Sequence, residues 1–196
     1  MIFKTPIEVS ARHLHLSPYD CEKLFGKNYK LKKLRDISQP GEFAAQEMII
    51  VKTKQSEFKN VRVVGPLRKN TQVEISKTDA YELGINPPLR QSGDLENSAG
   101  CLLIGPKGRV KLNQGVIISQ RHLHIDPLSA RKAGLKNKQL VSVKINSVGR
   151  PITFHKVIVR VAENYKLSFH LDTDEGNAAG IDGKVKGIVE INHSRK

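Results

Sequence analysis

Two copies of one short segment constrain the fold of this chain more than any other feature of its sequence. Residues 12–18 read Arg-His-Leu-His-Leu-Ser-Pro, and residues 121–127 read Arg-His-Leu-His-Ile-Asp-Pro. In each copy a serine or an aspartate followed by proline predicts the N-cap and first turn of a short helix. Gly26 and Gly134 then end these helices. The chain therefore contains an internal repeat, in which a strand bearing two histidines leads into a helix.

A third, looser copy of the pattern lies between the other two. Residues 72–76 read Gln-Val-Glu-Ile-Ser and lead into a helical segment, with Ser76 as N-cap and an acidic third residue that completes a capping box. When the three caps are aligned, His15, Glu74 and His124 stand at one position, two residues before the cap. Three strand-to-helix units therefore each present a side chain that can bind a metal ion.

Most of the remaining pattern is typical of β-strands. Short segments rich in Val and Ile are bounded by Gly, Pro or Asn, at residues 48–52, 61–64, 115–119, 157–161 and 185–191. Helices of about two turns are too short to serve as the crossovers of parallel βαβ units. The sequence therefore predicts a mainly β protein with short helices, built as two small β-barrels or sandwiches capped by short α-helices.

The domains are expected to be discontinuous in sequence. The N-terminal strand and the second histidine segment are alike, which favours placing both in one domain. That domain is expected to comprise residues 1–18 and 115–196. Residues 19–114 are expected to form the central domain.

The two histidine pairs have the spacing of metal ligands. Alternate side chains of a strand point to the same face, so the imidazoles of a His-x-His pair lie about 6.5–7 Å apart along the chain. Two ring nitrogens at this spacing can reach one metal ion at about 2.0–2.1 Å. One such pair is moderate evidence, because exposed or core histidines are common. Two pairs in duplicated contexts, His13 with His15 and His122 with His124, are stronger evidence for metal binding.

Two further residues can complete such sites. His170 opens the acidic segment His-Leu-Asp-Thr-Asp-Glu, whose carboxylates either orient metal ligands or form a solvated turn. For Asp174 and Glu175 the two interpretations are equally favoured. Glu74 lies between two apolar residues, where an unpaired buried carboxylate would be costly, so it either faces solvent or has a partner. Its alignment with the histidines favours a role as ligand.

Arg68 is the candidate for binding an anion. It lies in the turn Gly-Pro-Leu-Arg-Lys-Asn at residues 65–70, directly after the predicted strand at 61–64. A guanidinium at a strand end can hold a tetrahedral oxyanion through a bidentate fork. Many turns contain arginine, so this signal is weak by itself.

The basic charge of the chain favours anionic partners without selecting among them. Lys and Arg total 33 against 19 Asp and Glu, a formal net charge of +14. Such an excess attracts nucleic acids, anionic membranes or small phosphorylated ligands. There is no Trp, and the six Phe and four Tyr are not interleaved with the basic residues, which disfavours a surface that binds single-stranded nucleic acid.

The sequence favours the cytoplasm over a membrane or an extracellular location. No apolar run approaches the ~20 residues that a membrane-spanning helix needs. The N-terminal residues lack the apolar stretch and the cleavage site of a secretory signal. The two cysteines, Cys21 and Cys101, form no Cys-x-x-Cys pair, and so few thiols fit a reducing compartment.

Six segments together resemble the PduL-type phosphotransacylases, the phosphate propanoyltransferase family. They include Val-Ser-Ala-Arg-His-Leu-His-Leu-Ser, Gln-Pro-Gly-Glu-Phe-Ala-Ala-Gln-Glu and Gly-Pro-Leu-Arg, and they lie at residues 9–17, 39–47, 65–68, 92–94, 121–124 and 170–175. They run in the family's order across nearly the whole chain, which makes the set highly specific. The chain departs from the family's pattern at Glu42 and Gln46, where Gln and Glu are commoner.

The resemblance implies a fold and a metal centre. It implies two β-barrels, one closed by the N- and C-terminal segments and one built from the centre of the chain, with two divalent metal ions, usually zinc, between them. One ion would be held by His13, His15 and Glu74, and the other by His122, His124 and His170. Arg68 would bind phosphate, while no short motif identifies the residues of the coenzyme A pocket.

The resemblance also implies a reaction and its partners. The reaction is the reversible transfer of a short acyl group, acetyl or propanoyl, between coenzyme A and inorganic phosphate. The expected partners are therefore small molecules, acyl-CoA and phosphate, together with a second copy of the chain in a homodimer, and not nucleic acid or a membrane. Only eight residues precede the first motif, so the targeting extension of microcompartment members is not expected and free cytoplasm is favoured.

Two other functions stay open from the residues alone. A metal-dependent hydrolase would use a metal-bound hydroxide on a thioester or phosphoester, and it would need no phosphate. A basic nucleic-acid-binding module would keep the histidines as structural residues and would bind polynucleotides with a steep salt dependence.

Overall fold

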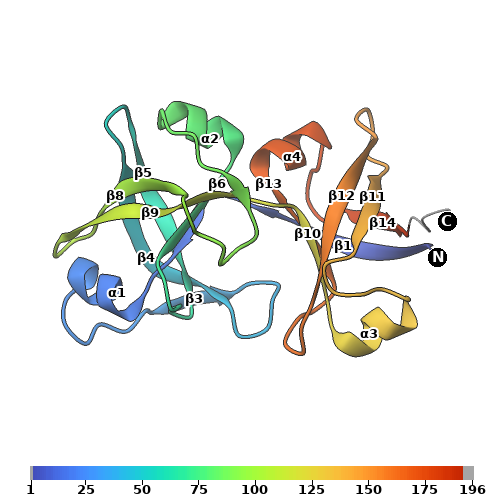
Figure 1. The fold of residues 1–196 in the computed structure, drawn as a ribbon, viewed down its shortest axis with the longest axis horizontal. Helices are drawn as coiled ribbons and strands as arrows, with labels where there is room; N and C mark the ends of the chain where they lie inside the picture. The colour runs from blue at the N-terminus through green and yellow to red at the C-terminus, as the bar shows by residue number, and fades with distance from the viewer. Residues whose placement is uncertain (1, 192–196) are drawn as a thin grey trace. The chain divides into compact units, whose positions relative to one another are not determined.

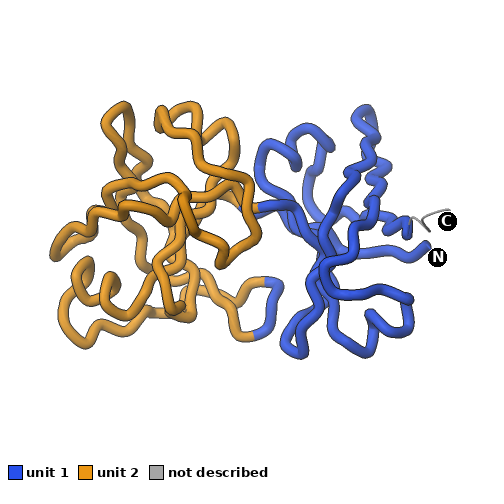
Figure 2. Tube along the Cα trace, in the orientation of Figure 1, with its two compact units in different colours: residues 1–10, 38–40, 120–196 blue, residues 11–37, 41–119 orange. Residues whose placement is uncertain are grey.

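The computed structural model describes residues 2–191, which form two compact units, coloured separately in Figure 2. Unit 1 comprises residues 1–10, 38–40 and 120–196, and unit 2 comprises residues 11–37 and 41–119. Each unit is built mainly of β-strands, as Figure 1 shows, with two short helices in each. Among the described residues, no helix has the length and apolar character needed to cross a bilayer.

Unit 1 is a closed six-stranded barrel with the strand order β1-β13-β10-β12-β11-β14. Its strands and helices are β1 (Ile2–Ser10), β10 (His122–Ile125), α3 (Pro127–Lys132), β11 (Leu140–Ile145), β12 (Ile152–Val161), β13 (Ser168–Asp172), α4 (Thr173–Ala178) and β14 (Lys186–Glu190). Phe169 and Leu123 are fully buried at its centre, among apolar residues from all six strands. Burial of these side chains is the main force that closes the barrel.

Unit 2 also contains a closed ring of six strands. Its elements are β2 (His13–His15), α1 (Pro18–Phe25), β3 (Lys33–Asp36), β4 (Phe43–Lys52), β5 (Glu57–Gly65), β6 (Gln72–Ile75), α2 (Lys77–Glu82), β7 (Leu89–Arg90), β8 (Ala99–Ile104) and β9 (Arg109–Ser119). The ring runs β9-β6-β2-β5-β4 and is closed by β8, which pairs with both β4 and β9. The short strands β3 and β7 pair with β4 and β9 outside the ring. Leu14, Val63 and Val73 are fully buried in the core of this unit.

The two barrels have equivalent topologies. In unit 2, β2 is parallel to β5 and antiparallel to β6, and β6 is parallel to β9. In unit 1, β10 is parallel to β12 and antiparallel to β13, and β13 is parallel to β1. The repeat recognised in the sequence is therefore a duplication of a whole barrel, and not only of a strand and a helix.

The two halves of the duplication exchange one strand. Along the chain β1 precedes β2, and β9 precedes β10. However, β1 pairs with β13 and β14 of unit 1, whereas β9 pairs with β6 and β8 of unit 2. Each barrel is therefore closed by the strand that precedes the histidine strand of the other barrel.

The predicted fold class is confirmed, and barrels rather than sandwiches form. The units differ from the predicted domains of residues 1–18 with 115–196 and residues 19–114. β2 and the start of α1 lie in unit 2, because β2 pairs with β5 and β6 of that unit. The two histidine strands consequently lie in different units, although their likeness in sequence had favoured one shared domain.

Candidate functional site

The first group of possible metal ligands lies on two paired strands of unit 2. His13 and His15 are alternate residues of β2, and β6 runs antiparallel to it with Glu74 opposite His13. One ligand atom from each of the three residues lies within 4.8 Å of the others. The Nε2 atoms of both histidines are 3.9 Å from Oε1 of Glu74. Leu14, between the histidines, points into the barrel core and is fully buried.

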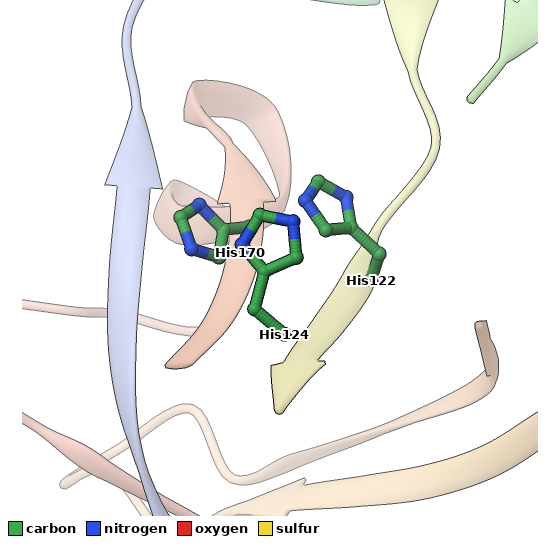
Figure 3. A group of neighbouring side chains, drawn as sticks. All are labelled: His122, His124 and His170. Carbon is green, nitrogen blue, oxygen red and sulfur yellow. The ribbon is translucent and has the colours of Figure 1, made fainter. Parts of the chain in front are cut away.

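The second group has the same architecture in unit 1. His122 and His124 are alternate residues of β10, and His170 of the antiparallel strand β13 lies opposite His122. Ligand nitrogens of the three residues again lie within 4.8 Å of one another. The ring centroids are separated by 4.5, 5.0 and 4.6 Å. Figure 3 shows that the three rings, carried by two strands, gather around one point.

Backbone carbonyls fix the orientation of three of these imidazoles. Nδ1 of His13 lies 2.9 Å from the carbonyl oxygen of Ala11, and Nδ1 of His122 lies 2.8 Å from that of Gln120. Nδ1 of His15 lies 3.0 Å from the carbonyl oxygen of Val64. A carbonyl can only accept a hydrogen bond, so Nδ1 carries the proton and Nε2 keeps the lone pair that a metal ion needs.

The electrostatics of the first group suit a cation. Burial, with the nearby positive charge of Arg68, lowers the pKa of His15 to about 3, so its imidazole is neutral at pH 7. Burial alone would raise the pKa of Glu74, but the neighbouring His13 and His15 and a hydrogen bond from Ser119 lower it to about 2. Glu74 is therefore an ionised carboxylate beside the neutral imidazole of His15, and these are the protonation states of metal ligands.

A hydrogen-bond chain joins Glu74 to Arg68. Ser92 donates through its hydroxyl to Oε1 of Glu74 at 3.0 Å, and Nη1 of Arg68 donates to the same hydroxyl at 2.9 Å. Nε2 of Gln72 donates to Oε1 of Glu74 at 2.5 Å and to the Ser92 hydroxyl at 2.8 Å. The other end of the Arg68 fork, Nη2, donates to Oε1 of Glu42 at 2.8 Å. The guanidinium thus lies one side chain away from the first group.

The turn that carries Arg68 is fixed by its backbone. The Arg68 N–H donates to the carbonyl of Leu16, just beyond β2, at 2.9 Å. At the start of the turn, a Cβ on Gly65 would lie 2.3 Å from the ring of Phe43, so only glycine allows this approach of β5 to β4. About a third of the Arg68 side chain stays exposed, at 32%. This leaves the guanidinium accessible to an anion.

Residues of β1 and of the loop at 38–40 surround His170. Nε2 of His170 lies 3.8 Å from Oε2 of Glu8, its neighbour on β1, and 3.4 Å from Nε2 of Gln39. The Gln39 amide also bonds to both the N–H and the carbonyl of Lys166, each at 3.1 Å. This pair of bonds holds the Gln39 side chain in place. Tyr165 stacks on His124 with a centroid distance of 3.9 Å.

The two cysteines are poor candidates for a nucleophile. Both are buried, Cys21 in α1 and Cys101 in β8. Burial raises the pKa of the Cys101 thiol to about 12 and also raises that of Cys21. The thiolate is the reactive form of cysteine, so neither side chain is activated.

The structure places the six predicted ligands in the two predicted groups, but it changes one relationship between them. Glu74 was aligned with His15 and His124, whereas the strand register makes it the counterpart of His170. Both residues lie opposite the first histidine of their pair and two positions before an N-cap, Ser76 or Asp172. Glu74 and His170 therefore occupy equivalent positions in the two barrels.

Sequence reasoning assigned no role to several neighbours of the two groups. Ser92 and Gln39 lie within segments that carried the family resemblance, but nothing in the local pattern indicated their contacts. Gln72 is two residues before Glu74 on β6, so its side chain lies on the same face. That alternation was a usable signal. Glu8 could not be found from local sequence, because it meets His170 through the pairing of distant strands.

The chain is similar to known proteins over nearly its whole length. A family model described as phosphate propanoyltransferase matches residues 6–182. A phosphate propanoyltransferase of Thermotoga maritima is 47% identical over 186 residues, which cover 94% of this chain and 89% of the relative. That of Priestia megaterium is 48% identical over 187 residues, 95% of this chain and 85% of the relative. That of Clostridioides difficile is 42% identical over 185 residues, 94% and 88% of the two chains.

Proposed function

Because the chain belongs to the phosphate propanoyltransferase family, we propose that it transfers a short acyl group, acetyl or propanoyl, reversibly between coenzyme A and inorganic phosphate. The predicted function and acyltransferase class are confirmed by this membership. The products in one direction are acyl phosphate and free coenzyme A. Both substrates are anionic, and the net charge of +14 favours their approach.

The two groups of ligands fit divalent metal ions, and we propose that each holds one. Two histidines with a glutamate, and three histidines, are both ligand sets of catalytic zinc sites that leave a position open for substrate. The carbonyl-bound Nδ1 atoms of His13, His15 and His122 present Nε2 for coordination. A bound divalent ion, with zinc as the first choice, would polarise the thioester carbonyl as a Lewis acid.

The side chains of this protein position the phosphate. Arg68 would hold two phosphate oxygens through its planar fork, which also orients the third oxygen for attack. Attack forms a bond from phosphate oxygen to the carbonyl carbon. The carbon–sulfur bond then breaks, and its electron pair leaves on the coenzyme A thiolate. No acyl-enzyme is needed, in keeping with the inactive thiols of Cys21 and Cys101.

One observation carries this proposal for the site. Ser92 bonds both to Arg68 and to Glu74, so the phosphate-binding guanidinium and a ligand of the first group belong to one hydrogen-bond network. A thioester hydrolase would have no need for an anion-binding arginine at this place. The network therefore favours phosphate, and not water, as the acyl acceptor.

The proposal is tested by a thioester assay with and without phosphate. Purified protein is expected to release coenzyme A from acetyl- or propanoyl-CoA only when phosphate is present, with acyl phosphate as the other product. Chelation should remove the activity, and added zinc or cobalt should restore it. Free acid formed without phosphate would identify a hydrolase instead. Steeply salt-dependent binding of polynucleotides by metal-free protein would support the nucleic-acid alternative.

We also propose a homodimer, on the basis of the family resemblance, and a cytoplasmic location, which the small number of cysteines favours. Light scattering after size-exclusion chromatography measures the mass of the particle. A mass of one chain would contradict the dimer. A fluorescent fusion in the native cell would reveal whether the protein is diffuse or confined to microcompartments.

A further inference from the structure

The two arginines that precede the histidine pairs make equivalent contacts. Arg12 donates through Nε and Nη2 to Oδ1 of Asp79, at 3.0 and 2.6 Å. Arg121 donates through Nη1 to Oε1 of Glu175 at 2.6 Å. Asp79 and Glu175 are each the third residue of the helix that follows the third ligand strand, α2 after β6 and α4 after β13. The same ion pair is therefore present once in each unit.

Each of these carboxylates also binds the backbone beside a proposed ligand. Oδ2 of Asp79 accepts from the N–H of the N-cap Ser76 at 3.2 Å, and Oε2 of Glu175 accepts from that of Asp172 at 3.4 Å. These N-caps lie two residues after Glu74 and His170. In each unit, one carboxylate thus connects the arginine that precedes the first ligand with the N-cap that lies two residues after the third ligand.

Aromatic rings support both guanidiniums at matching places. Arg12 lies over the ring of Phe58 at 4.0 Å from its centroid, and Arg121 lies over that of Phe154 at 5.4 Å. Phe58 stands four residues before the β5 residue that pairs with His13, and Phe154 stands four residues before the β12 residue that pairs with His122. The same contact is therefore present at equivalent places in the two barrels.

We infer that Arg12–Asp79 and Arg121–Glu175 are positioning pairs that fix the third ligand of each group relative to the first. The inference rests on the proposal that both groups bind divalent ions. Metal sites require ligands held within about 0.5 Å of their places by surrounding bonds. Strand pairing alone sets His13 opposite Glu74 and His122 opposite His170. The ion pair adds a second connection, from the arginine that precedes the first ligand to the helix that follows the third ligand. This connection stops the two ligand strands from shifting relative to each other.

Metal affinity distinguishes positioning from simple stabilisation. Purified protein is stripped of metal and titrated with Co²⁺ alone, against a chromophoric chelator, while the visible spectrum reports ligand geometry. The variant Arg12→Met is expected to bind the ion of the His13, His15 and Glu74 group about 10- to 100-fold more weakly, because the loss of a residue that orients a ligand has an effect of this size. Arg121→Met should weaken the binding of the other ion, at the group that contains His122. Arg12→Lys, which keeps the charge and one bond, should recover part of the affinity.

Controls separate the possible outcomes. Lys52→Met removes an exposed ion pair with Glu57, 2.7 Å long, and should leave both ions and the spectrum unchanged. Where a Met variant fails to fold, Asp79→Asn and Glu175→Gln serve instead, because they keep the capping oxygen and remove the charge. Each should still weaken the binding of one ion. Wild-type cobalt affinity and spectrum in these variants, with only a lower Tm, would overturn the inference. Absence of cobalt binding by the wild-type protein would instead overturn the proposed metal sites.

Discussion

At the scale of single residues, the contacts of Arg68 bear on its proposed role in binding phosphate. Its two terminal nitrogens are held by the Ser92 hydroxyl and the Glu42 carboxylate, at 2.9 and 2.8 Å. Each partner occupies one terminal nitrogen of the guanidinium. Their chemistry differs, however, because a neutral hydroxyl leaves the positive charge intact whereas a carboxylate offsets it.

Replacing Arg68 with alanine should affect phosphate far more than the thioester. Hydrogen bonds to a charged group contribute about 1.5–3 kcal/mol, which corresponds to roughly 10- to 100-fold in binding. We therefore expect the apparent KM for phosphate to rise by about this factor, with little change in the KM for acyl-CoA or in Tm. Steady-state kinetics at varied phosphate measures it. Arg109→Ala, at an exposed arginine of β9, is the matched control, and an equal loss there would contradict the assignment.

Replacing Glu42 with glutamine should change the KM for phosphate in the opposite direction. A carboxylate on Nη2 competes with phosphate for the same donor, and an amide competes less because it is neutral. The KM for phosphate is expected to fall about threefold, a small effect because Glu42 and Arg68 are each about a third exposed and screened by water. Glu57→Gln, at a carboxylate of equal exposure that pairs with Lys52, should change nothing. A rise in KM for Glu42→Gln would mean that the carboxylate orients Arg68 instead of competing.

At the scale of elements, one local rule places four of the six proposed ligands, and strand alternation adds His13 and His122 two residues earlier. Each of the four short helices begins at an N-cap two residues after a ligand: Ser17, Ser76, Asp126 and Asp172. The cap accepts from the third residue of the helix, which ends the strand sharply. Because the strand ends there, its last residues on the face away from the core lie beside those of the paired strand, so the side chains gather without a long loop.

This rule explains how much of the site the sequence predicted. Alternation along a strand puts His122 and His124 on one face and Leu123 on the other, so the ligand pairs and the buried leucine follow from local pattern alone. The cap signals located three of the four units in the same way. The sequence did not reveal that Glu74 corresponds to His170, because that equivalence depends on which strands pair. Contacts such as Glu8 with His170 depend on the same long-range register.

The leucine between the histidines should separate stability from chemistry. Leu123 is fully buried on the core side of β10. Leu123→Ala should lower the free energy of unfolding by about 2–5 kcal/mol, because it removes buried apolar volume and leaves a cavity. The histidines stay in place, so the number of cobalt ions bound should not change. Chemical denaturation measures the loss, and Leu128→Ala, at a leucine that is 55% exposed, should cost no more than about 0.5 kcal/mol.

At the scale of the whole molecule, the exchange of strands explains why the domain boundaries could not be read from the sequence. A repeat unit in sequence runs from β1 to β8, and the next runs from β9 to β14. Neither repeat closes a barrel by itself, since each needs the first strand of the other repeat. Likeness in sequence shows which segments are equivalent, whereas hydrogen bonding decides which barrel each segment joins. The predicted boundaries followed sequence likeness.

Removing β1 should consequently damage the barrel that is distant from it in sequence. β1 pairs with β13 and β14, so a chain without residues 1–10 would expose one unpaired edge on each of these strands. We expect hydrogen–deuterium exchange to become fast in β13 and β14, and cobalt binding to the group that contains His170 to be lost. β4 and β5 of unit 2 take their hydrogen bonds within that unit and should keep their protection, as the internal control. Uniform loss of protection would mean that the barrels unfold as one cooperative unit, and unchanged protection of β13 would mean that β1 contributes little to its barrel. Selective loss is expected because strand pairing, and not nearness in sequence, holds each ligand group together.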